Sequence, residues 1–135
     1  MTTPRKTKQR VTGLGGIFFK AKNPKKLQAW YRQHLGLPLD PSWGGMSFDW
    51  REAKQPKKKG STVWSAFEPD TEYFGAGKQT FMINYRVDNL KKVLAALKKE
   101  RVWVDPKGSA ASEFGKFAWI RDGEGNRIEL WQPPT

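Results

Sequence analysis

The apolar positions near the N-terminus predict a strand followed by a helix. Residues 16–21 read as the strand. Asn23 and Pro24 mark the helix start, because an asparagine side chain caps free amides and proline suits the first helical position. Apolar side chains then recur at helical spacing, at Leu27, Trp30, Tyr31 and Leu35. Gly36 follows, where a residue in the left-handed conformation ends a helix.

The same order of elements returns later in the chain. Residues 82–87 read as a strand, and Asp88 or Asn89 can cap the helix that follows. The apolar face of this helix carries Leu90, Val93, Leu94 and Leu97, and the helix is expected to end near Glu100. At an offset of about 66 residues, the second strand and helix cap align with the first strand and helix cap, although few of the aligned residues are identical. A repeat of this length indicates a duplicated half-domain.

Short β segments are predicted after each helix. After the first helix come residues 46–50 and 62–67, and after the second come 102–104, 116–121 and 127–131. The last two segments are joined by a strong turn signal, Asp122–Asn126. Together the elements predict one α+β domain over residues 11–135, whose halves span about 11–68 and 79–133. A flexible basic arm, residues 1–10, is expected to precede it.

Composition narrows the class of protein. The chain has 135 residues, 37% of them hydrophobic, and no cysteine. This excludes disulfides, thiolate metal sites and cysteine nucleophiles, and it suits a reducing, cytoplasmic location. No apolar run approaches the length of a membrane span, so no membrane partner is expected. The start of the chain is basic and polar, unlike a signal peptide.

The net charge of +12 favours anionic partners. Basic residues gather in the arm and in the loop Lys54–Lys59, and others lie on the outer faces of the predicted helices. One interpretation is a solvated surface that keeps the protein soluble. The alternative is a nucleic-acid-associated module that uses the arm and this loop, whose binding weakens steeply with salt. No nucleic-acid fold motif accompanies these lysines.

Two motifs point to a known family. The first helix ends in the aromatic-rich run Ala29–Leu37, which contains a Leu-Gly turn. The closing segment Phe117–Trp131 holds an Asp-x-x-Gly-Asn turn and an Ile-Glu-Leu strand. At this separation they resemble the vicinal oxygen chelate superfamily, which includes glyoxalases, bleomycin-resistance proteins and extradiol dioxygenases, over Val11–Pro134. The resemblance implies two tandem βαβββ modules that form a curved mixed sheet with a half-barrel cleft and helices outside, often in a homodimer.

The metal site that the resemblance implies is largely missing from this sequence. Metal-using members place His or Gln in the first strand of each half, where this chain has Gly16 and Met82. They place Glu on each half's last strand, where this chain has Glu129 and a position within 63–66 without a normal ligand. His34 ends a helix and is not expected to bind metal. No cofactor is expected, and a divalent metal is disfavoured.

Strand alternation predicts which side chains face the cleft. Glu129 is the candidate catalytic base or hydrogen-bond acceptor. The candidate ligand-binding residues are Phe18, Lys20, Trp64, Met82, Asn84, Arg86, Trp119, Arg121 and Trp131. Ile17, Phe19 and Ile83 are expected in the core behind the sheet. The structural alternative is that these aromatic residues simply fill a closed half-barrel.

A basic chain should prefer a neutral or anionic small molecule over the cationic drugs of bleomycin-resistance proteins. If the protein is an enzyme, the resemblance implies a lyase/isomerase-like or dioxygenase-like reaction. In that case the chemistry should depend on Glu129 and Asn84.

Overall fold

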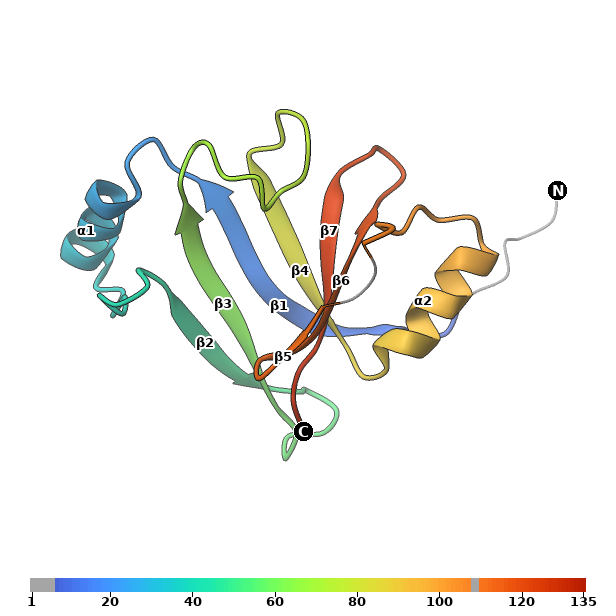
Figure 1. Ribbon diagram of the computed structural model, residues 1–135. Coiled ribbons are helices and arrows are strands. Elements are labelled where there is room, and N and C mark those ends of the chain that lie inside the picture. Colours follow the sequence, from blue (N-terminus) through green and yellow to red (C-terminus); the bar gives the residue numbers. More distant parts are fainter. Residues whose placement is uncertain (1–6, 108–109) are drawn as a thin grey trace, which may run out of the picture.

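The computed structural model describes residues 7–107 and 110–135. Within them lies a seven-stranded mixed sheet with the order β2-β3-β1-β4-β7-β6-β5. The strands are β1 (Val11–Lys20), β2 (Met46–Arg51), β3 (Lys59–Phe67), β4 (Phe81–Val87), β5 (Ala110–Ser112), β6 (Gly115–Arg121) and β7 (Arg127–Gln132). The helices are α1 (Pro24–Leu35) and α2 (Leu90–Lys99). The sheet curves without closing, and the helices lie toward its opposite ends (Figure 1), which confirms the predicted α+β fold.

The two halves meet at the antiparallel pair β1–β4 in the centre of the sheet. Ile17 lies opposite Ile83, its counterpart in the predicted repeat. On one side β3 pairs in parallel with β1, and on the other β7 pairs in parallel with β4. The halves are therefore related by an approximate two-fold axis through this central pair.

The halves differ in their strands. The first half has β1, β2 and β3, and the segment Glu68–Thr80, along which a fourth strand would run, contains no strand. In the second half, the predicted strand at 102–104 is wrong: Val104 makes only an isolated bridge to Ile120. The second strand of that half is β5, at Ala110–Ser112.

Both helices start at the predicted caps. The Asn23 side chain accepts a hydrogen bond from the backbone of Lys26 at 3.1 Å, and the Asn89 side chain accepts one from Lys92 at 3.0 Å. Gly36 ends α1 with φ of +66°, a value that favours glycine. No helix in the described part of the chain is long and apolar enough to cross a membrane.

The two helices pack differently on the sheet. The apolar face of α2 lies on a core of Val87, Leu90, Ala118, Ile120 and Leu130. In contrast, α1 packs toward β3, where the rings of Tyr31 and Trp64 lie 4.9 Å apart. It leaves the middle of the convex face uncovered, so Ile17, predicted to be core, is 44% exposed and Phe81 is 45% exposed.

The end of the basic arm is bound to the domain. Arg10 donates two hydrogen bonds to the Glu100 carboxylate, at 3.1 and 2.7 Å. Strand β1 begins at the next residue. Residues 1–6 of the predicted arm lie outside the described residues.

Candidate functional site

The candidate site lies on the concave face of the sheet. Leu130 packs against the α2 side, so its neighbours on β7, Glu129 and Trp131, point to the opposite face. The strand register places further predicted residues on that face: Phe18, Met82, Asn84, Arg86 and Trp119. Seven of the predicted site residues therefore share one surface at the centre of the sheet.

Glu129 is the central group of this surface. Its side chain is 1% exposed, and it pairs across the sheet with Asn84 on β4 and Trp119 on β6. The Asn84 amide donates to Glu129 Oε1 at 2.6 Å, and the Trp119 indole N–H donates to Oε2 at 2.9 Å. The Tyr73 hydroxyl donates a further short hydrogen bond to Oε2. One carboxyl group thus accepts three hydrogen bonds.

Burial and hydrogen bonding act on Glu129 in opposite directions. Desolvation raises the pKa of its carboxyl group, since burial disfavours the charged form. The three hydrogen bonds lower the pKa again, as does the charge of Arg127, but burial prevails and the pKa stays raised. Burial and the neighbouring carboxylate also raise the pKa of Tyr73, which keeps its hydroxyl protonated as a donor. A buried acid with a raised pKa is suited to proton transfer.

The segment Glu68–Thr80 covers the concave face. Phe74 is 1% exposed and packs with Phe18 and Met82, while the ring of Tyr73 stacks on Phe67 with centroids 5.6 Å apart. The predicted cleft is therefore filled at its centre by side chains from this segment. Tyr73 and Phe74 were missed by sequence reasoning because an irregular segment carries no periodic signal.

Gln79 holds this segment to β7. Its amide nitrogen donates to the carbonyls of Phe81 and Arg127, at 2.6 and 2.9 Å, and its amide oxygen accepts from the Arg127 N–H at 2.7 Å. The Arg127 side chain continues into a buried ion pair with Asp105, at 3.0 Å. Its guanidinium lies 5.5 Å from the centre of the Trp119 ring. Hydrogen bonds of Gln79 and the ion pair of Arg127 thus connect the segment Glu68–Thr80 to β7 and to Asp105.

The predicted cationic residues lie apart from one another. The Arg86 guanidinium lies between the rings of Trp131 and Trp50, at 4.9 and 5.5 Å from their centres. Lys20 lies over the ring of Phe74 at 5.8 Å. Arg121 lies over the ring of Trp103, at 5.0 Å. Lys20 and Arg86 are equivalent in the repeat, but they contact different aromatic residues.

Trp64 is not on the concave face. Its ring contacts Phe19 at 5.2 Å and Tyr31 of α1 at 4.9 Å, so it lies on the helix side. The register explains this position, because Trp64 pairs with Ile17, whose side chain points to the convex face. This placement does not support the prediction that Trp64 lines the cleft.

Solved structures of other proteins share this fold. A methylmalonyl-CoA epimerase from Mycobacterium tuberculosis matches with a TM-score of 0.60 and 16% identity, over 97% of this chain and 94% of that one. A Streptomyces coelicolor methylmalonyl-CoA epimerase in complex with 2-nitronate-propionyl-CoA matches with a TM-score of 0.66 and 13% identity, over 93% and 99%. The fold is that of the vicinal oxygen chelate proteins.

The sequence comparisons add nothing to this assignment. No family model matches the chain, and no curated protein matches it. A Legionella pneumophila protein described as an NAD-dependent benzaldehyde dehydrogenase also matches in structure, with a TM-score of 0.58 and 12% identity, over 88% of this chain and 98% of that one. At such identities the likeness establishes the vicinal oxygen chelate fold, and the site must be judged from its own residues.

The residues around Glu129 do not fit the metal of vicinal oxygen chelate enzymes. Among the described residues, no group of three or more His, Cys, Asp or Glu side chains is placed to hold a metal ion. The groups that contact the carboxylate are the Tyr73 hydroxyl, the Asn84 amide N–H and the Trp119 indole N–H, and each directs a hydrogen toward it. A cation at Glu129 would face three donors in place of further ligands.

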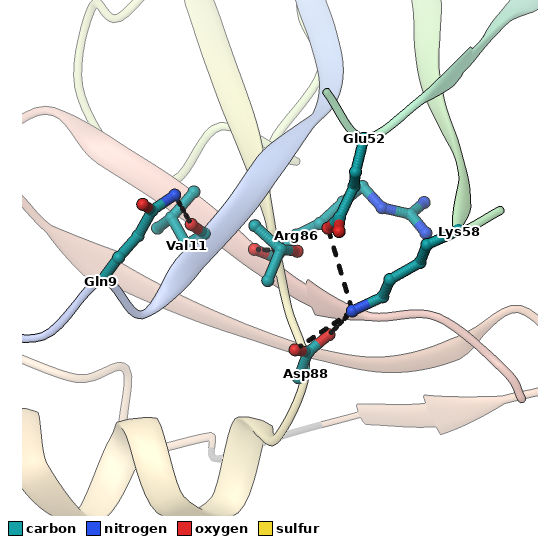
Figure 2. A network of polar contacts seen from close by, with 7 residues as sticks. Gln9, Val11, Glu52, Lys58, Arg86 and Asp88 are labelled. Atoms are coloured by element: carbon teal, nitrogen blue, oxygen red, sulfur yellow. Dashed lines mark hydrogen bonds and ion pairs between the residues drawn. The ribbon is translucent and has the colours of Figure 1, made fainter. Parts of the chain in front are cut away.

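One lysine of the predicted nucleic-acid loop is already engaged. Figure 2 shows Lys58 directed toward Glu52 and Asp88, with Nζ to carboxylate oxygen distances of 3.8 and 3.2 Å. These contacts join the β2–β3 loop to the end of β4, next to Arg86. The nucleic-acid alternative gains no support from this arrangement.

Proposed function

We propose that the protein binds a small neutral or anionic molecule on the concave face of its sheet, in a site that works without a resident divalent metal. We propose further that Glu129 exchanges a proton with this molecule in a lyase/isomerase-like reaction. The observation that supports the proposal is the buried Glu129 carboxyl group with its three hydrogen-bond donors. A base of this kind can take up a proton and return it from a fixed position.

The three hydrogen-bond donors to Glu129 have different roles in the proposed site. Asn84 and Trp119 lie on strands next to Glu129 and orient its two oxygens. Tyr73 lies on the segment Glu68–Thr80 and is the donor that can leave when that segment moves. A ligand that displaces Tyr73 would find Glu129 Oε2 released from one hydrogen bond and facing the ligand.

The ligand class follows from charge and from the related folds. The net charge of +12 favours an anionic molecule. Structural neighbours are described in complex with methylmalonyl-CoA and with 2-nitronate-propionyl-CoA. We therefore propose acyl-CoA thioesters with an acidic α C–H bond as the first class to test.

The test is solvent deuterium exchange at the α carbon of methylmalonyl-CoA, followed by NMR with protein pretreated with EDTA. Exchange by the EDTA-treated protein, and its loss in Glu129→Gln, is the expected result. Exchange that requires added divalent metal would refute a metal-free site. Equal exchange by Glu129→Gln would refute the role of Glu129. Binding of methylmalonyl-CoA without exchange would refute the proposed reaction and support a binding function alone.

We also propose that the protein forms a homodimer through its convex face. Leu14, Ile17 and Phe81 lie on the central strands and are 43%, 44% and 45% exposed. Their partners across the β1–β4 pair continue this apolar surface. An apolar surface in the centre of a sheet, uncovered by either helix, is suited to pack against a second copy.

A further inference from the structure

The buried face of α1 contains an unexpected polar residue. Gln28 is 8% exposed, whereas Trp30 and Leu35 of the same helix are 49% and 61% exposed. The Gln28 side-chain amide lines a hollow beside α1, and it is not among the buried polar groups that lack a hydrogen-bond partner in the described part of the chain. A glutamine amide in the lining of a hollow presents both a donor and an acceptor to a ligand there.

Gln28 lines a hollow of about 410 Å³ between α1 and the turn Asp40–Gly45. Lys25, Gln28 and Arg32 stand at helical spacing on one face of α1 and form one wall. Trp43 and Gly44 form the opposite wall, and Ala66 and Glu68 lie beneath. The volume falls within the range of about 300–1,000 Å³ that is typical of small-molecule sites.

The opposite wall is a hydrogen-bonded turn that lies close to the glutamine side chain. The Gly44 N–H donates to the Asp40 carbonyl at 2.6 Å, and the Asp40 carboxylate accepts from the backbone of Ser42 at 2.8 Å. Gly44 has φ of +80°, and a Cβ there would lie 2.4 Å from Gln28 Nε2. The amide therefore rests against the glycine backbone, and only glycine leaves it room.

The groups around the hollow define a ligand class. The Gln28 amide offers one donor group and one acceptor, which match the hydrogen-bonding edge of a heteroaromatic ring. Trp43 is 49% exposed and offers a flat apolar surface for such a ring. Lys25 and Arg32 outnumber Glu68, so the rim carries an excess of positive charge.

We infer that this hollow, which we name the α1 pocket (Lys25, Gln28, Arg32, Trp43, Gly44 and Glu68), is a second ligand site for a planar heteroaromatic anion such as a nucleoside monophosphate. It contains no residue of the Glu129 site. It lies against α1, on the helix side of β3, whereas Glu129 faces the opposite side of the sheet. Binding here is therefore independent of the function proposed for Glu129.

The experiment is a titration of ¹⁵N-labelled protein with AMP, followed by two-dimensional NMR. The side-chain amide of Gln28 and the backbone amide of Gly44 should shift in a saturable manner. In Gln28→Leu, which keeps the size of the side chain, affinity for AMP should fall at least tenfold while the melting temperature stays the same or rises. The control is Gln33→Leu, an exposed position of α1, which should bind AMP as the wild type does.

Two further titrations separate the parts of the ligand. Arg32→Glu, at an exposed position that cannot disturb the core, should weaken AMP binding and leave adenosine binding unchanged. Inorganic phosphate alone should shift these resonances only weakly. Absence of a saturable shift with AMP, unchanged affinity in Gln28→Leu, or shifts centred on Glu129 would each overturn the inference.

Discussion

A carboxyl group that accepts three hydrogen bonds is well satisfied when charged, yet burial opposes that charge. Both effects act on Glu129, and the pKa of its carboxyl group is raised because burial outweighs the hydrogen bonds. The same balance explains why the Tyr73 phenol, with its raised pKa, remains a donor. At the residue scale, burial therefore favours the protonated form of Glu129, and its hydrogen bonds favour the charged form.

The pH dependence of stability should report this balance. The free energy of unfolding of the wild type should fall as pH rises from about 4.5, the ordinary pKa of glutamate, through the raised pKa of folded Glu129, because the unfolded chain ionises first. In Glu129→Gln this decline should vanish. Urea denaturation of both proteins across pH measures the difference between them. A difference that is constant with pH would contradict the raised pKa.

Gly15 is a second residue whose role can be measured. A Cβ at this position would lie 2.1 Å from Asn84 Oδ1 and 2.8 Å from the Trp131 ring. Gly15→Ala should therefore reduce the free energy of unfolding by about 1–3 kcal/mol, since the packed site cannot yield. Gly123→Ala is the matched control, because no atom lies within 4 Å of its Cβ position, and it should be neutral or slightly stabilising. Equal stability of the two variants, measured by urea denaturation, would refute the crowding at Gly15.

At the scale of elements, local signals were predictive and non-local ones were not. Asn23, Gly36 and Asn89 mark helix ends through contacts with their own helices, so sequence alone located them. Alternation along β4 and β7 placed Asn84 and Glu129 on one face, and the structure brings them into contact.

The failures have physical causes. The first strand was predicted over residues 16–21, but β1 begins at Val11, and the irregularities in its register between Val11 and Gly16 interrupt the alternation there. The side of Trp64 depends on its pairing with Ile17, which no local pattern encodes. The exposure of Ile17 depends on where α1 packs on the sheet, and this is determined by tertiary contacts that the local sequence does not encode.

The segment Glu68–Thr80 is the element most open to experiment. Gln79→Ala removes the hydrogen bonds that join it to Phe81 and Arg127. Amide hydrogen exchange within residues 68–80 should accelerate several-fold while exchange in α2 is unchanged, because loss of these contacts favours local opening. Gln33→Ala, at an exposed helix position, is the control. If exchange in the segment stayed at the wild-type rate, Gln79 would not be its anchor.

At the scale of the whole molecule, the uncovered convex face distinguishes the two helices. The apolar face of α2 packs on the sheet, whereas α1 packs to one side and leaves the middle of the central strands exposed. A protein with a charge of +12 repels its own copies in solution, so the association proposed through this apolar surface should strengthen with salt.

Disruption of that surface should abolish self-association. Ile17→Lys, at the centre of the convex face, should convert a dimer into a monomer in sedimentation equilibrium at moderate salt. Leu35→Lys introduces the same charge at a site that is 61% exposed on α1, and it should leave the dimer intact. A wild-type protein that is monomeric at all concentrations would contradict the proposed dimer.

The strand order also governs how the sheet is completed as the chain is synthesised. The parallel neighbours β1 and β3 leave the ribosome well before β4, so one long edge of β1 stays without a partner during translation of residues 68–80. Such an open edge can pair with another nascent chain. Arrival of β4 closes this edge and at once supplies the template on which β7 docks. The central pair is thus both the centre of the finished sheet and the step at which the open edge of β1 is closed.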